Sequence, residues 1–108
     1  MINISDFQKL ELKVGTVVVA EVVEGSEKLI KLTVDFNEED TRTILTGMKQ
    51  WKTPEDFKEK QLVFVTNLEP RMIMGIESQG MIMAVDGGED SPVFLVPETE
   101  VPNGSKIR

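Results

Sequence analysis

The sequence has 108 residues, which suits one domain with its own core, and 40% of them are hydrophobic. It contains no cysteine and no histidine. This excludes a disulfide framework, a thiolate metal site and the usual general base near neutral pH. No apolar run approaches the roughly 20 residues that span a bilayer, and residues 1–6 lack the features of a secretory signal. We therefore expect a single cytoplasmic domain over residues 1–108.

The net charge of −7 is unfavourable for a nucleic-acid-binding protein, because phosphate contacts require lysine or arginine. The distribution of charge matters more than its sum. Acidic residues bunch at 35–40 and 86–90, where turns are expected, and basic residues lie elsewhere. A local basic face is therefore possible, although composition alone argues against RNA binding.

The N-terminal region predicts a short helical turn followed by a long strand. Ser5 is a candidate N-cap, with Phe7 and Leu10 packing before the sheet. Residues 14–23 are rich in β-branched side chains and predict the first strand. Gly15 indicates a bulge or sharp bend within it. The side chains expected to share one face of this strand are Val14, Thr16, Val18, Ala20 and Val22.

A meander of three antiparallel strands is predicted next. After a turn at 24–27, residues 28–36 alternate between apolar and polar side chains. A polar turn at 37–40 separates this strand from a third one at 41–46. The side chains expected to point inward from the second strand are Ile30, Leu32, Val34 and Phe36.

The remaining elements complete the pattern of a five-stranded OB-fold barrel, an all-β fold. Thr53 followed by Pro54 has the form of a helix start, and the helix must be short because residues 61–66 predict strand four. Residues 81–85 predict strand five. A helix between strands three and four is typical of the OB-fold, whereas an SH3-like barrel normally lacks it. We expect a barrel over about 12–85 and a proline-rich, extended C-terminal extension over about 86–108, with a final short strand at 93–96.

Three candidate residues before the fourth strand have two interpretations each. Lys31 and Arg42 lie on predicted strands of the face that OB-folds commonly use for ligands, but solvated ion pairs are the favoured interpretation. Trp51 is flanked by lysines and could stack on a base. A tryptophan before a short helix more often plugs one end of a barrel, and this is the interpretation that we favour.

The loop after the fourth strand carries stronger candidates. Asn67 can cap a turn or face a ligand. Arg71 follows Pro70, whose fixed φ restricts the loop, and its guanidinium can bind phosphate through two parallel hydrogen bonds. The alternative is an arginine paired with Glu69 or Glu77. The methionines of this region are expected to fill the core or an interface: Met72, Met74, Met81 and Met83.

These segments resemble a known family. Residues 67–71 (NLEPR) and 74–81 (MGIESQGM) carry the resemblance, together with residues 23–32 and 101–106. They are similar to the tRNA-binding OB-fold family, which includes the C-terminal domain or beta subunit of methionyl-tRNA synthetase and stand-alone structure-specific tRNA-binding proteins. The resemblance gives a tRNA-facing role to Lys31, Arg42, Asn67, Arg71, Ser78 and Met81, with Lys28 and Lys49 at the edge of the basic patch.

The resemblance also implies a function and partners. We expect a non-catalytic module, without cofactor, metal or catalytic residue, that raises the tRNA affinity of methionyl-tRNA synthetase or acts in trans. The family dimerises through segments outside the barrel, which would explain the C-terminal extension. The sequence departs from the family at Met72, where members often carry a lysine, and at 51–52, where a tyrosine-rich pair is replaced. The alternative is a secretion-related, chaperone-like dimer of the same fold that binds peptides.

Overall fold

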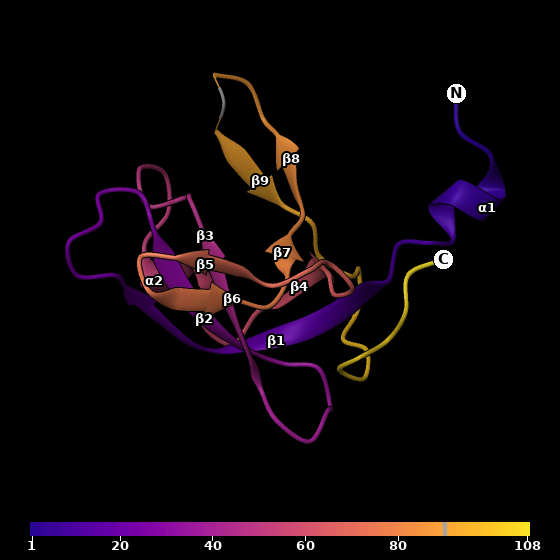
Figure 1. The fold of residues 1–108 in the computed structure, drawn as a ribbon, viewed down its shortest axis with the longest axis horizontal. Coiled ribbons are helices and arrows are strands. Elements are labelled where there is room, and N and C mark those ends of the chain that lie inside the picture. The colour runs from indigo at the N-terminus through magenta and orange to yellow at the C-terminus, as the bar shows by residue number, and fades with distance from the viewer. Residues whose placement is uncertain (90) are drawn as a thin grey trace.

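A computed structural model describes residues 1–89 and 91–108 as an all-β fold with two one-turn helices (Figure 1). Five strands form an antiparallel, nearly closed barrel sheet in the order β3-β2-β1-β4-β7, which confirms the predicted OB-fold-like barrel. Among the described residues, neither helix is long and apolar enough to cross a bilayer. The elements are α1 (Ile4–Phe7), β1 (Leu12–Val22), β2 (Ile30–Asp35), β3 (Arg42–Thr46), α2 (Pro54–Phe57), β4 (Gln61–Val65), β5 (Arg71–Ile73), β6 (Ile76–Ser78), β7 (Met81–Ile82), β8 (Ala84–Asp86) and β9 (Pro92–Phe94).

The long strand β1 bends so that it pairs with two neighbours. Its first part pairs with β4 and its second part pairs with β2. The register against β2 shifts between Val17 and Val19. Val17 and Ala20 are buried on either side of this irregularity, and Val18 and Val19 are both exposed. The prediction that Val18 shares a face with Val14 and Ala20 is therefore wrong, because a strict two-residue alternation does not continue across a bulge. Val22, predicted on the same face, is also exposed.

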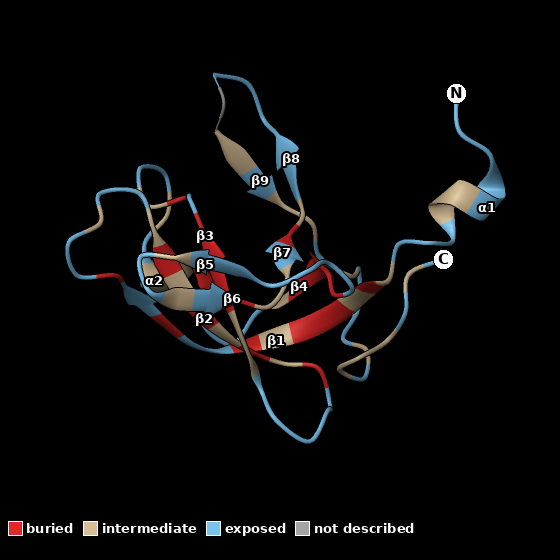
Figure 2. Ribbon diagram, viewed as in Figure 1, coloured by how far each residue is buried: buried red, intermediate tan, exposed pale blue. Residues whose placement is uncertain are grey.

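Strand β2 and the core follow the predicted alternation. All four predicted inward side chains are buried: Ile30, Leu32, Val34 and Phe36. The plug was misassigned, however. Trp51 is 42% exposed, and Phe57 of α2 is 0% exposed and belongs to the core cluster. Figure 2 shows buried segments on the barrel strands β1, β3 and β4 and exposed residues along β8. Phe57 packs against Phe94, with ring centroids 5.0 Å apart. The helix therefore supplies its own aromatic residue to the core.

The two helices differ in how well their N-caps were predicted. Thr53 is the N-cap of α2, as predicted, and its backbone N–H donates to the Asp56 carboxylate at 2.8 Å, which lowers the pKa of Asp56. The N-cap of α1 is Asn3 rather than Ser5. Asn3 Oδ1 accepts from the Asp6 N–H at 2.9 Å, and Asp6 accepts from the Asn3 N–H in return. An asparagine paired with an acidic residue three positions later completes a capping box, and Ser5 has no such partner in the cap.

The region after β4 differs most from the prediction. The loop predicted before strand five forms the hairpin β5–β6, and strand five itself is divided. Only Met81–Ile82 stays in the barrel against β4. Residues Ala84–Asp86 leave it and pair with Pro92–Phe94, where the last strand was predicted to span 93–96. The β8–β9 hairpin projects from the barrel (Figure 1).

The end of the chain returns to β1. The Val14 N–H donates to Ser105 O at 2.9 Å, and the Ile107 N–H donates to Leu12 O, also at 2.9 Å. These bonds occupy the first part of β1, where β2 does not reach. Residues 104–107 therefore cover a strand edge that would otherwise be open.

Gly15 gives a direct test of the packing inside the barrel. A Cβ at this position would lie 2.7 Å from side-chain atoms of Phe36 and Val34. We expect Gly15→Ala to lower the free energy of unfolding by about 1–3 kcal/mol through overpacking. The matched control is Gly47→Ala, since an added Cβ there meets nothing within 4 Å. Urea unfolding followed by circular dichroism measures both; equal stability of the two variants would contradict the prediction.

Candidate nucleic-acid interface

The basic side chains divide into two groups. One group is paired with acidic residues within 4.0 Å: Lys9 with Asp6, Lys13 with Glu11, Lys31 with Glu21, Arg42 with Glu38, and Lys58 with Glu55. Within residues 1–89 and 91–108, the other basic residues have no ion pair: Lys28, Lys49, Lys52, Lys60, Arg71, Lys106 and Arg108. The basic side chains of this second group are therefore the ones whose charge is not offset by a paired carboxylate in the described residues.

The β5–β6 hairpin forms one wall of a hollow of about 470 Å³. Three residues with a predicted tRNA-facing role line this hollow: Arg71, Ser78 and Met81. Arg71 is exposed, and the alternative pairing with Glu69 or Glu77 does not occur among the ion pairs of the described residues. Leu45 of β3 also lines the hollow, and the Leu45 N–H donates to Ser78 Oγ at 3.0 Å. Ser78 is buried, so it fixes the hairpin to the barrel beneath the hollow.

Lys31 lies beside this hollow on the same face of the sheet. It pairs directly with Leu45 across β2 and β3, and directly opposite residues point to the same side. Its Nζ lies 3.6 Å from Glu21 Oε1. Exposed pairs of this kind are weak, so a phosphate can compete for the lysine.

A second hollow, of about 500 Å³, lies at the tip of the hairpin. Ile73 lines both hollows, and Lys28 lines the second one. Lys49 joins this region because its backbone N–H donates to Lys28 O at 3.1 Å and its Nζ donates to Ser26 O at 2.9 Å. The two lysines predicted at the edge of the patch are therefore neighbours, at the other end of the hairpin from its junction with the barrel.

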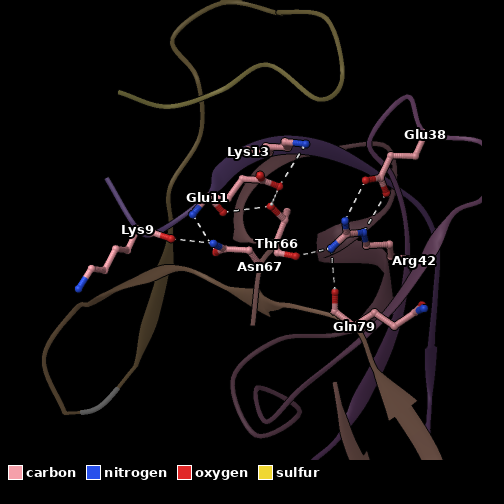
Figure 3. Close-up of polar contacts among 8 residues, drawn as sticks. All are labelled: Lys9, Glu11, Lys13, Glu38, Arg42, Thr66, Asn67 and Gln79. Atoms are coloured by element: carbon pink, nitrogen blue, oxygen red, sulfur yellow. Dashed lines mark hydrogen bonds and ion pairs between the residues drawn. The ribbon is translucent and has the colours of Figure 1, made fainter. Parts of the chain in front are cut away.

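Arg42 bonds to both ends of residues 66–79, the segment that carries Arg71 (Figure 3). Its Nη1 donates to Thr66 O at 2.6 Å and to Gln79 O at 3.2 Å, and its Nε and Nη2 donate to the Glu38 carboxylate, both at 2.8 Å. This bidentate pair raises the pKa of Arg42 and lowers the pKa of Glu38 below its ordinary value of 4.5. Because its donors are used in this way, Arg42 positions the segment and does not offer a free guanidinium to a ligand.

Asn67 has a similar position at the start of the segment. Its Oδ1 accepts from the Glu11 N–H at 2.8 Å and its Nδ2 donates to Lys9 O at 2.7 Å (Figure 3). Thr66 Oγ1 donates to the Glu11 carboxylate at 2.8 Å, and this bond, together with Lys13, lowers the pKa of Glu11. The structure therefore brings Arg71, Ser78 and Met81 together around one hollow, with Lys31 next to its Leu45 wall. It places Arg42 and Asn67 at the base of the segment over residues 66–79.

Comparisons with known proteins agree with this architecture. A family model described as "Putative tRNA binding domain" matches residues 12–106. The chain belongs to this tRNA-binding family. This confirms the resemblance found in the sequence. It also confirms the expectation of an accessory tRNA-binding domain rather than a catalytic one.

Individual relatives show where this tRNA-binding domain occurs. The chain is 42% identical over 107 residues to a methionine–tRNA ligase of Methanococcoides burtonii, covering 99% of the chain and 16% of the ligase. The crystal structure of a MetRS related protein from Pyrococcus horikoshii has a TM-score of 0.93 at 38% identity, with 100% of this chain and 98% of that chain covered. The chaperone CsaA from Bacillus anthracis has a TM-score of 0.88 at 32% identity, with coverage of 100% and 99%. The chain therefore spans a small part of the ligase and nearly all of the two solved structures.

The positioning role of Arg42 in the tRNA-binding domain predicts a stability defect. We expect Arg42→Lys to lower the free energy of unfolding by about 1–3 kcal/mol at pH 7, because a lysine keeps the charge but not the fork that bridges Glu38 and the two carbonyls. The pKa of Glu38 is lowered in the folded state, so the stabilisation from this pair is present above pH 4.5 and is lost as the pH falls below that value.

The difference between Arg42→Lys and the unchanged chain should therefore shrink at pH 3. Urea unfolding at pH 7 and pH 3 measures it. Lys9→Ala is the control, since the side chain of Lys9 is 79% exposed. An Arg42→Lys variant as stable as the unchanged chain at pH 7 would rule out the positioning role.

Proposed function

We propose that the chain is a non-catalytic, structure-specific tRNA-binding module that raises the tRNA affinity of methionyl-tRNA synthetase or acts in trans. The observation that carries this proposal is the hollow along β5–β6, where Arg71, without an ion-pair partner in the described part of the chain, lies with Ser78 and Met81. A cytoplasmic location is part of this proposal. The module would supply affinity, and the chemistry would remain with the synthetase.

The contacts of this site favour recognition of shape and phosphate. Arg71 can grip a phosphate through two hydrogen bonds, and Lys31 and Lys28 can add single contacts on either side of the hairpin. Three or four phosphate contacts imply a shallow salt dependence, with affinity falling about tenfold to a hundredfold between about 50 and 200 mM salt. Modest affinity is consistent with the net charge of −7.

Arg71 is the residue whose removal tests this proposal. We expect Arg71→Ala to weaken binding to different tRNAs by a similar factor, roughly threefold to tenfold at low salt, because a phosphate contact carries no sequence information. The salt slope should fall by about 0.7–0.9. Fluorescence anisotropy of two labelled tRNAs between 50 and 200 mM salt measures both effects, with Lys9→Ala as the charge-matched control.

Two results would count against the face proposed here. Unchanged binding in both Arg71→Ala and Lys31→Ala would show that the tRNA contacts lie elsewhere. Loss of one tRNA with retention of the other in Arg71→Ala would indicate base readout instead of shape recognition.

A peptide-binding, chaperone-like function is the second candidate. The exposed methionines around the hollow favour it, since Met72 is 67% exposed, Met74 and Met81 are also exposed, and methionine surfaces adapt to varied apolar partners. The similarity to chaperone CsaA agrees with this candidate. A competition experiment decides between the two functions, with tRNA and an unfolded peptide titrated against the same chain. If the first proposal is right, Arg71→Ala weakens the binding of tRNA and leaves the binding of the peptide unchanged.

We also propose that the chain forms a homodimer through the extension over residues 86–108. The projecting β8–β9 hairpin, where this extension begins, exposes the side chains of Val85 and Val93, and exposed apolar side chains on an element that extends from a barrel are a suitable contact for a second copy. We expect sedimentation equilibrium at micromolar concentration to give about twice the monomer mass of 12.1 kDa. Val93→Asp should shift the chain toward monomer. A monomer at all concentrations for the unchanged chain would contradict the proposal.

A further inference from the structure

Trp51, the chain's only tryptophan, is exposed and held by a fixed backbone turn. Its N–H and that of Lys52 both donate to Met48 O, each at 2.9 Å, and Met48 is part of the core cluster. The indole has an exposed fraction of 42%, although tryptophan gains much from full burial. The turn therefore fixes the backbone at Trp51, and the indole stays partly exposed.

The surroundings of Trp51 are basic. Lys49 lies two residues before it, and its Nζ donates to the neutral carbonyl of Ser26. Lys28, whose carbonyl accepts from the Lys49 N–H, is exposed. Neither lysine forms an ion pair in the part of the chain that the structure describes. Glu27 lines the same hollow and offsets part of this charge, so the positive field here is local and moderate.

The hollow at the hairpin tip includes Lys28 and Ser26, and Lys49, two residues before Trp51, bonds to the carbonyls of both. This hollow has a volume of about 500 Å³, within the range of small-molecule sites, and Lys28, Ile73 and Met74 line it. An exposed aromatic ring beside lysines without counter-ions suits a nucleotide, because the base stacks on the ring and the phosphate meets the ammonium groups. Arg71 lies at the other hollow, and Ile73 separates the two.

We propose that Trp51, with Lys28 and Lys49, is a stacking subsite for an unpaired nucleotide of bound RNA. This inference rests on the proposed RNA-binding function and adds a second contact to it. The face around Arg71 binds phosphates of the folded RNA, and Trp51 takes a base that lies outside a duplex. Because stacking tolerates every base, this subsite adds affinity for unpaired RNA without adding sequence preference.

The tryptophan fluorescence of the chain reports on Trp51 alone, because the sequence has no other tryptophan. The full chain is titrated with an oligoadenylate hexamer, with a blunt RNA duplex of the same length and with tRNA, and the tryptophan emission is followed. We expect quenching by the hexamer and by tRNA, and much weaker quenching by the duplex. Anisotropy of labelled RNA measures binding independently of the tryptophan.

Two substitutions of Trp51 separate stacking from other roles. Trp51→Ala should weaken hexamer binding roughly fivefold to a hundredfold, and Trp51→Phe should retain most of the affinity. Lys28→Ala should also weaken it, whereas Lys9→Ala, the same charge change on a lysine already paired with Asp6, should not. Thermal melting of each variant checks the fold, which an exposed side chain should affect little.

The outcomes distinguish this inference from the function on which it rests. Binding of tRNA by anisotropy, with unchanged tryptophan emission and unchanged affinity in Trp51→Ala, would overturn the subsite and leave the tRNA-binding proposal intact. Absence of tRNA binding in the unchanged chain would overturn both. Quenching together with weaker binding of Trp51→Ala and retained binding of Trp51→Phe would establish the subsite.

Discussion

The hydrogen bonds of the Arg42 guanidinium are the interaction on which the proposed binding surface depends. The guanidinium bridges Thr66 O, at the end of β4, and Gln79 O, just before β7, and the Glu38 carboxylate holds it in that orientation. The segment between these carbonyls contains a hairpin with only three residues in each strand. A two-stranded hairpin of this size is not stable alone in water. Fixing both of its ends reduces the conformational entropy that the segment must lose before Arg71 can meet a ligand.

The acidic balance of the chain is compatible with binding to an anion because charges act locally. At physiological salt, interactions between exposed charges fade over about 8 Å. The acidic residues Glu11 and Glu38 are committed to Lys13 and Arg42 at the base of the segment, whereas Lys28 and Arg71 have no such partner among the described residues. Negative charge therefore helps to build the scaffold, and part of the positive charge remains free for a ligand.

The sequence predicted the elements whose signals are local. The alternation of residues 30–36 and the Thr53-Pro54 helix start reflect side-chain period and cap chemistry, which are readable over a few residues. The irregularity between Val17 and Val19 was placed too early, at Gly15, because glycine there serves a different need: the close approach of Phe36. The position of Trp51 just before a short helix predicts a plug, but Phe57 of that helix fills this place in the core instead.

The site was harder to predict, because its residues depend on contacts between distant parts of the chain. Arg71, Ser78 and Met81 came from a motif and lie together. The carbonyl partners of Arg42 lie 24 and 37 residues away in the chain, so no local pattern could show that its guanidinium is already occupied. One signal was available: Glu38 lies in the short polar turn predicted just before the strand that carries Arg42, so the two side chains are close in the chain.

The use of amides inside the segment is consistent with the recognition of shape that we propose. Amide side chains are the neutral groups best suited to read base edges. Both amide groups of Asn67 form hydrogen bonds with the backbone of Lys9 and Glu11. The Oε1 of Gln79 accepts from the Thr43 N–H at 2.9 Å. Arg71 and Lys28 remain toward the hollows, among apolar side chains and the carboxylates of Glu69 and Glu27. A phosphate contact from these basic groups carries no sequence information, and the hydrogen bonds that make the segment rigid withdraw the Asn67 amide from base readout.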